Sequence, residues 1–234
     1  MDAANVVFAR LVPCKPDKRS VIRRNISGAI AMPSRAVLPR ILGALFYYSP
    51  ERPEVKALFD CLPTLPELYP WRDRGHIESL CASWSLPDDD ALTWQFSVLF
   101  EGQGKMPVPP WGSVYLEKDN LLMGETTADY RAFLQSQGMV FTDREREPED
   151  QFGLMLLACS DLLAQGDNVA ANRLLEAHLL PWGFRYLELL QRNTVSAFYA
   201  RLAIVATCYL QDVQQQQGLQ PEKKRLFSKV LVRF

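Results

Sequence analysis

Apolar residues recur at spacings of three and four along most of the chain, which is the period of an α-helix that buries one face. The pattern first becomes regular at Ser34, whose side chain can cap a helix. This first helix is expected to stop at Ser49, because the residue before Pro50 is disfavoured in helical geometry. Its apolar stripe consists of Leu38, Ile41, Leu42, Leu45 and Phe46.

Three shorter segments follow before a loop. The spacing predicts helices over 54–62 and 77–84, and a third helix after the three aspartates at 88–90, whose negative charge suits a helix N-terminus. The apolar face of this third helix contains Leu92, Phe96, Leu99 and Phe100. Residues 102–111 contain two glycines and three prolines, which predicts a loop. We expect residues 114–116 to be briefly extended.

The second half of the chain predicts four longer helices, over 126–137, 148–165, 168–180 and 194–217. Their boundary signals are a capping-box pair at Thr126 and Asp129, Pro148 in a first turn, Asp167 at an N-cap and Pro181 as a stop. The glutamines at 214–217 are expected to be the frayed, polar end of the last helix.

No β-hairpin or alternating βαβ pattern interrupts residues 34–217, so the predicted fold class is all-α. We expect a single helical domain of about ten helices with one long loop rich in proline and glycine. Residues 1–33 are basic and aperiodic, which predicts a disordered extension or an upstream segment with the true start at Met32. Arg23 and Arg24 form a twin arginine, but the apolar stretch that follows is too short for a leader. Residues 218–234 are expected to be an irregular basic tail.

Charge and cysteine usage restrict the class of protein. The net charge of −1 argues against nucleic acid or an anionic membrane as the main partner. The sequence has no apolar run of about 20 residues for a membrane span and no secretory signal. Its five scattered cysteines are typical of reduced thiols in a cytosol. With only two histidines, we expect no metal site.

Sequence motifs for catalysis are missing. The chain has no GxxxxGK[ST] phosphate loop and no GxGxxG, GxSxG, HExxH or EF-hand pattern, each of which supplies a specific chemistry. We therefore expect a binding protein with no catalytic residue and no cofactor.

Two segments are chemically suited to binding. The prolines at 107–110 stiffen a loop, which reduces the entropy lost on binding, and Trp111 beside them offers a large apolar face with an N–H group. Trp111 either contacts a ligand or packs under the loop, and the sequence favours neither. The acidic segment 143–151 precedes a predicted helix, where Glu149 is expected to act as a simple cap. Asp150 can act as a cap or can accept a guanidinium. His178 is expected to be a hydrogen-bonded packing residue.

Five short segments in order carry a resemblance to a known family. They are LGALFYY at 42–48, PPWGSV at 109–114, GETT at 124–127, EPED at 147–150 and HLLPW at 178–182. Together they resemble the TorD/DmsD family of redox-enzyme maturation chaperones, and its DmsD branch most closely, over roughly residues 38 to 205.

The resemblance implies a TorD-like all-helical fold and a bacterial, cytoplasmic chaperone that is not an enzyme. Members bind the twin-arginine leader of a molybdopterin-containing oxidoreductase of the DMSO reductase type, and assist cofactor insertion and proofreading before export by the Tat translocase. The positions that the resemblance associates with leader binding are Phe96, Leu99, Phe100, Pro110, Trp111, Gly124, Asp150 and Gln151. Further candidates are Glu125, Glu147 and Glu149. Gln151 stands where the family has histidine, so peptide binding can survive while any dependence on that histidine's proton is lost.

Two other functions remain open at this point. Guanine-nucleotide binding has been proposed for the family, so a regulator that binds GTP is one alternative, although the missing phosphate loop counts against it. A helical protein-interaction scaffold without leader specificity is the other. In each case we expect neither nucleic-acid binding nor stable insertion into a membrane.

Overall fold

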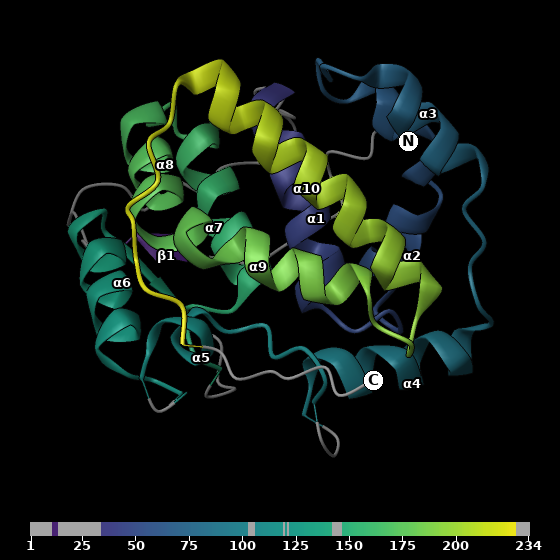
Figure 1. The fold of residues 1–234 in the computed structure, drawn as a ribbon. Helices are drawn as coiled ribbons and strands as arrows, with labels where there is room; N and C mark the ends of the chain where they lie inside the picture. Colours follow the sequence, from purple (N-terminus) through teal and green to yellow (C-terminus); the bar gives the residue numbers. More distant parts are fainter. Residues whose placement is uncertain are drawn as a thin grey trace, which may run out of the picture.

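The structure, a computed structural model, describes residues 11–13, 34–102, 106–118, 120, 122–141 and 147–227. Most of this length is helical, which confirms the all-α prediction (Figure 1). The elements in chain order are β1 (Leu11–Pro13), α1 (Ser34–Tyr47), α2 (Pro53–Phe59), the 3-10 helix η2 (Leu62–Glu67), α3 (Arg74–Ala82), α4 (Asp89–Phe100), α5 (Gly112–Leu116), α6 (Glu125–Ser136), β2 (Met139–Phe141), α7 (Phe152–Ala164), α8 (Asn168–Leu174), the π-helical turn η3 (Leu175–Leu179), α9 (Leu180–Gln191) and α10 (Ala197–Gln217). The rest of the extension predicted over 1–33, and residues 228–234 of the predicted tail, lie outside the described residues.

Helices α1 and α7 form the centre of the core. Eleven of the thirteen residues of α7 are buried, as expected for a helix that is apolar on all sides. The two backbones approach closely at facing glycines. A Cβ atom on Gly153 would lie 2.7 Å from the carbonyl oxygen of Gly43, and one on Gly43 would lie 2.8 Å from the carbonyl oxygen of Gly153. A side chain at either position would therefore force the helices apart.

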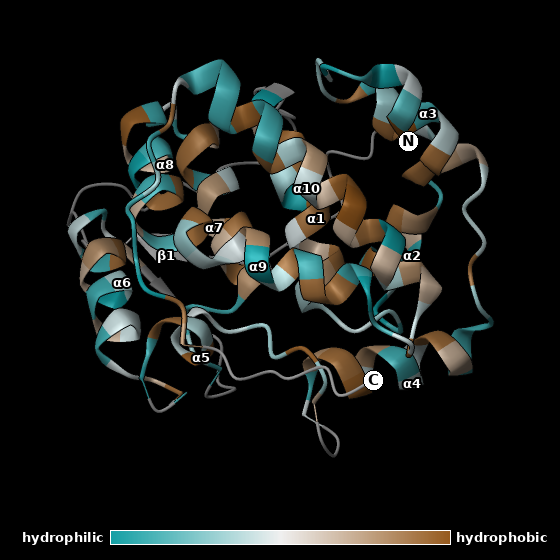
Figure 2. Cartoon of the chain, viewed as in Figure 1, coloured by the Kyte–Doolittle hydropathy of each residue, from teal (hydrophilic) through white to brown (hydrophobic). Residues whose placement is uncertain are grey.

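Helix α10 crosses in front of α1 and packs along α9 (Figure 1). Its last turns are hydrophilic (Figure 2), which agrees with the glutamines at 214–217. These residues are helical to Gln217 rather than frayed. They stay ordered because Gln215 accepts a hydrogen bond from Arg72, and Gln216 contacts Tyr69 and the carbonyl of Pro70.

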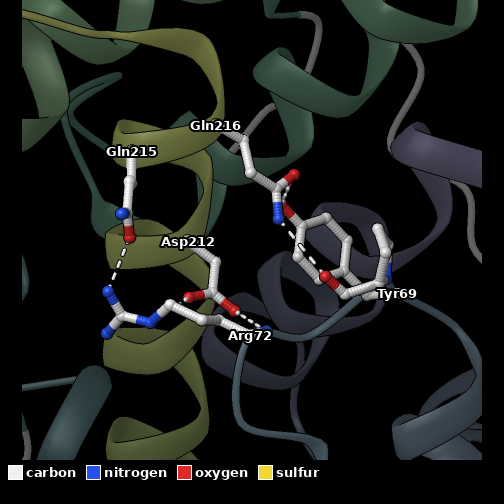
Figure 3. A network of polar contacts seen from close by, with 6 residues as sticks. Tyr69, Arg72, Asp212, Gln215 and Gln216 are labelled. Atoms are coloured by element: carbon white, nitrogen blue, oxygen red, sulfur yellow. Dashed lines mark hydrogen bonds and ion pairs between the residues drawn. The ribbon is translucent and has the colours of Figure 1, made fainter.

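A polar network fastens the segment between η2 and α3 to α10 (Figure 3). Asp212 is buried, and its Oδ2 accepts a hydrogen bond of 2.9 Å from the backbone N–H of Arg72. The Arg72 guanidinium donates to Gln215 at 2.6 Å and lies 3.7 Å from Asp212 Oδ1. Because Asp212 satisfies a backbone group from a distant part of the chain, it fixes how this segment packs on α10.

Several predicted boundaries are wrong because tertiary contacts replace the local signal. Residues 114–116 belong to helix α5 and are not extended. Helix α6 begins at Glu125 and does not use the capping box. Instead, the carboxylate of Glu117 accepts hydrogen bonds of 2.8 Å from both the N–H and the hydroxyl of Thr126. The helix predicted to start at Pro148 starts at Phe152, so Glu149 and Asp150 lie in the turn before it.

The helix capped by Asp167 forms as predicted, with the carboxylate accepting from Ala170 N–H at 2.9 Å. It does not stop at Pro181, however. The chain passes from α8 through the π-helical turn η3 into α9. A proline lacks the N–H that the previous turn would need, and the wider turn accommodates it in the first turn of α9.

Two peripheral segments complete the described fold. Strand β1 pairs antiparallel with β2, with Val12 opposite Val140, a contact too short for sequence alternation to predict. After α10, residues 219–227 are irregular, as predicted for the tail, and run past α8 towards α5 (Figure 1).

Replacing Gly153 by alanine should lower the free energy of unfolding by about 1–3 kcal/mol or more, because the added Cβ overpacks the contact with α1. Urea denaturation measures this. Gly183→Ala on α9 is the matched control, since its Cβ would meet Phe152 at an ordinary 3.5 Å. That variant should be unchanged or more stable by up to about 1 kcal/mol, because alanine favours a helix over glycine. Equal stability of Gly153→Ala and the native chain would contradict a tight contact.

Asp212→Ala should lower the free energy of unfolding by about 1–3 kcal/mol, because it leaves the Arg72 N–H without its acceptor. Gln215→Ala removes an exposed partner of the same arginine and should change stability by less than about 0.5 kcal/mol. Thermal unfolding of the two variants checks this difference, and equal losses would show that the buried carboxylate has no special part in it.

Candidate functional site

The start of α7 and the proline-rich loop lie side by side. An antiparallel bridge joins Trp111 to Gln151. Two backbone hydrogen bonds form it, from Phe152 N–H to the Pro110 carbonyl at 2.8 Å and from Gly112 N–H to the Asp150 carbonyl at 3.0 Å. The two segments that the sequence singles out for binding are therefore held together through their backbones.

Trp111 is half-buried at this junction, with its ring against the edge of the core. Its indole N–H donates to Glu147 Oε1 at 2.5 Å. The side chain packs against the core under the loop, which is one of the two interpretations that the sequence leaves open, and part of it stays exposed. Glu147 orients the indole rather than projecting freely into solvent.

Asp150 is buried, with 3% of its surface exposed. Its Oδ2 accepts a hydrogen bond of 2.6 Å from the N–H of Ser113, so it caps α5 rather than its own helix. Burial raises the pKa of Asp150, against the influence of the Ser113 N–H and of the Ser113 and Thr127 hydroxyls. Direct access of an arginine to this carboxylate requires the covering groups to move.

Several buried oxygens lie around this carboxylate, and the hydroxyls of Ser113 and Thr127 are close enough to lower its pKa. Four buried oxygens make no hydrogen bond of normal geometry within the described residues: Asp150 Oδ1, Ser113 Oγ, Thr127 Oγ1 and the Tyr130 hydroxyl. Such atoms are rare in folded proteins and mark places where a ligand or water can bind. A cavity of about the size of one water molecule lies here, with Gly112, Tyr130, Asp150, His178, Trp182 and Lys224 in its lining.

Gln151 has a structural position. Its Oε1 accepts from Leu154 N–H at 2.9 Å, which caps α7, and its Nε2 donates to the Phe46 carbonyl at 3.0 Å near the end of α1. The side chain is 2% exposed. This residue therefore ties α1 to α7, and its amide supplies both the donor and the acceptor that the position requires.

Helix α6 is fastened to the same site by side chains that periodicity does not reveal. Glu149 forms a two-pronged ion pair with Arg131 at 2.6 and 2.7 Å. It is therefore not the simple cap that the sequence predicts. Burial would raise the pKa of Glu149, but its hydrogen bonds and the Arg131 charge leave it below its ordinary value. Gly124 lies close against Glu117, because a Cβ atom there would be 2.5 Å from the Glu117 carboxyl carbon and would force that side chain to shift. Glu125 is exposed beside it.

The three apolar candidates of α4 lie in the core. Phe96, Leu99 and Phe100 are between 0 and 4% exposed, and the Phe100 ring packs on Phe46 and Tyr199. These side chains pack inside the core and do not form part of the site's surface. In the same helix, 61% of the Trp94 surface is exposed. Trp94 lies outside the apolar stripe of the helix, and a tryptophan in such a position is a sequence feature that indicates a solvent-exposed aromatic side chain.

His178 and Tyr130 close the other side of the cavity. The His178 ring lies 5.2 Å from that of Tyr130 and 5.1 Å from that of Phe133. Burial lowers the pKa of His178 to about 4, and the charges of Lys224 and Arg173 act in the same direction. The ring is thus neutral near pH 7. Sequence analysis predicted packing for His178 but did not connect it to Asp150.

The described residues also bear on metal binding and on membrane insertion. Among the described residues, no three His, Cys, Asp or Glu side chains are grouped as metal ligands. Within the same part of the chain, no helix combines the length and apolar character of a membrane span.

Known proteins are similar to this chain in sequence. The nitrate reductase delta subunit family matches residues 72–188. The Tat proofreading chaperone DmsD of Salmonella typhi is 34% identical over 82% of this chain and 95% of its own length. A probable Tat proofreading chaperone DmsD of Haemophilus influenzae is 30% identical over 76% of this chain and 89% of its own. A putative redox enzyme maturation protein from Archaeoglobus fulgidus superposes with a TM-score of 0.49 at 18% identity, over 81% of this chain and 99% of that one.

The two DmsD relatives are at least 30% identical to this chain over more than three quarters of its length. The chain belongs to the TorD/DmsD family of redox-enzyme maturation chaperones.

Proposed function

We propose that this protein binds the twin-arginine leader of a molybdopterin-containing oxidoreductase of the DMSO reductase type, and releases it for export once the cofactor is inserted. The relatives named as Tat proofreading chaperones support this role. The protein acts without catalytic turnover, in the cytoplasm, before the client reaches the Tat translocase.

The observation that carries the proposal is the bridge between Trp111 and Gln151. It holds a partly exposed indole and a buried carboxylate on neighbouring positions of two paired segments. A twin-arginine leader has two positive charges and an apolar stretch, so it needs both kinds of group. The leader's apolar residues pack on Trp111, and one arginine is drawn towards Asp150.

The remaining candidate residues act through these two. Glu147 orients the indole, Pro110 and Gln151 hold the bridge, and Gly124 lets α6 approach Glu117. Neither a guanine-nucleotide-binding regulator nor a generic scaffold gains support from the site or from the relatives.

Trp111→Ala should weaken binding of a synthetic twin-arginine leader about ten-fold or more, because burying one such side chain contributes about 1.5–3 kcal/mol. Isothermal titration measures the affinity, and circular dichroism shows that the helices persist. Trp94→Ala removes the exposed tryptophan of α4 and should leave the affinity within about two-fold. Unchanged affinity in Trp111→Ala would exclude this surface as the leader site.

Asp150→Asn keeps the shape of the side chain and an acceptor for Ser113 N–H while it removes the charge. Leader affinity should fall about ten-fold, since a charge-assisted hydrogen bond contributes about 1.5–3 kcal/mol. The loss should persist at high salt, because buried charges are screened less than exposed ones. Glu125→Gln changes an exposed carboxylate nearby, and any effect of it should disappear at high salt. A leader with both arginines replaced by glutamine should bind both proteins equally weakly.

A further inference from the structure

The segment that follows α10 is held against the candidate site along its length. Leu219 is buried, and the N–H of Gln220 donates to Glu176 Oε1 at 2.6 Å. Further along, Glu222 N–H donates to the Glu176 carbonyl at 2.9 Å, and Phe227 N–H donates to the Tyr115 carbonyl at 2.8 Å. The segment 219–227 therefore runs from the C-terminus of α10 across η3 to α5, the helix that Asp150 caps (Figure 1).

The chemistry of this segment matches that of the proposed ligand. Residues 223–225 are Lys, Lys and Arg, and residues 226–227 are Leu and Phe. A twin-arginine leader likewise combines basic residues with an apolar stretch that follows them. The chain thus carries, beside its own candidate site, a short sequence of the same character.

The side chain of Lys224 reaches the cavity that contains Asp150. Lys224 lines this cavity together with Tyr130, Asp150 and His178, and its charge helps to lower the pKa of His178. Lys224 Nζ forms a long ion pair of 3.7 Å with Glu222 Oε2 of its own segment. The neighbouring Lys223 is exposed and does not line the cavity.

We propose that residues 219–227 are an internal ligand of the leader site, with Lys224 occupying the subsite for a basic side chain that Tyr130, Asp150 and His178 form. This inference rests on the proposed function, because the leader is the ligand that displaces the segment. A tethered segment has an effective concentration in the millimolar range, so a weak contact is enough to occupy the site.

The arrangement explains two features of the site together. The internal ligand relates the burial of Asp150, a candidate for recognising a peptide, to the position of Lys224 in the lining of the same cavity. The covering segment is irregular and is attached by three N–H hydrogen bonds, the buried Leu219 and an ion pair of 2.9 Å between Glu222 and Arg173. A segment held by so few contacts opens at a lower free-energy cost than a packed helix. Leader affinity is then reduced by the fraction of molecules in which the segment is closed.

Two full-length variants test the proposal. Lys224→Gln should bind a synthetic twin-arginine leader about three- to ten-fold more tightly than the native chain, because the closed state is populated less. Lys223→Gln removes the same charge from the adjacent position and should stay within about two-fold of the native affinity. Isothermal titration of the same peptide against all three proteins gives the comparison.

Hydrogen exchange separates displacement of the segment from a general effect of charge, because a change of charge alone would leave the exchange rates of the segment's amides unchanged. Leader binding should speed amide exchange at Glu222 and Phe227, whose N–H groups are bonded to Glu176 and Tyr115 in the closed state. Phe227→Pro removes the second of these bonds near the chain end, and should also tighten leader binding. Unchanged or greater protection of the segment in the complex would overturn the proposal.

The outcomes separate the two proposals. Equal leader affinity for the native chain, Lys224→Gln and Lys223→Gln would overturn the internal ligand and leave the proposed function intact. Weaker binding in Lys224→Gln would overturn it too, because the lysine would then belong to the leader's own site. Failure of all three proteins to bind the leader would refute the proposed function, and the internal ligand with it. Binding by Lys224→Gln alone would support both.

Discussion

The close contact of α1 and α7 at Gly43 and Gly153 is the constraint on which the site depends. Because the backbones touch there, Gln151 at the start of α7 can reach the Phe46 carbonyl near the end of α1 while it caps its own helix. That fixes the turn before α7, and therefore the position of Asp150. The bridge between Trp111 and Gln151 then fixes the proline-rich loop to the start of α7, so the loop and the helix keep the same relative position.

The polar groups of the site serve structure and recognition at once. Asp150 caps α5 and anchors one edge of the cavity, and Glu149 secures α6 through Arg131. The buried hydroxyls around Asp150 have no normal hydrogen bond in the described structure, a cost that proteins tolerate mainly at functional positions. The Asp150 carboxylate is therefore held in place by its Oδ2, while its Oδ1 has no hydrogen bond of normal geometry.

The protein is almost neutral overall, and residues 223–225 form a local basic segment. The net charge of −1 gives no general attraction for cations, so selectivity for a basic peptide has to come from the few carboxylates at the site. Within segment 219–227, Lys224 lines the cavity that contains Asp150. Competition between this segment and a leader would keep peptides with a weaker basic pattern out of the site.

The sequence by itself determined the features that depend on neighbouring residues. Helical periodicity predicted the all-α class. The predicted cap at Asp167 and the acidic residues at 88–90 marked the starts of two helices, and prolines and glycines located the loop before Trp111. Only the tertiary structure decided which side chains meet. Thr126 was expected to cap a helix, but its own N–H is bonded by Glu117. Gln151 links α1 to α7. Lys224 lines a cavity with Asp150 although 74 positions separate the two. Periodicity records which face of a helix is buried, whereas contacts between distant segments depend on how helices cross, which no local pattern encodes.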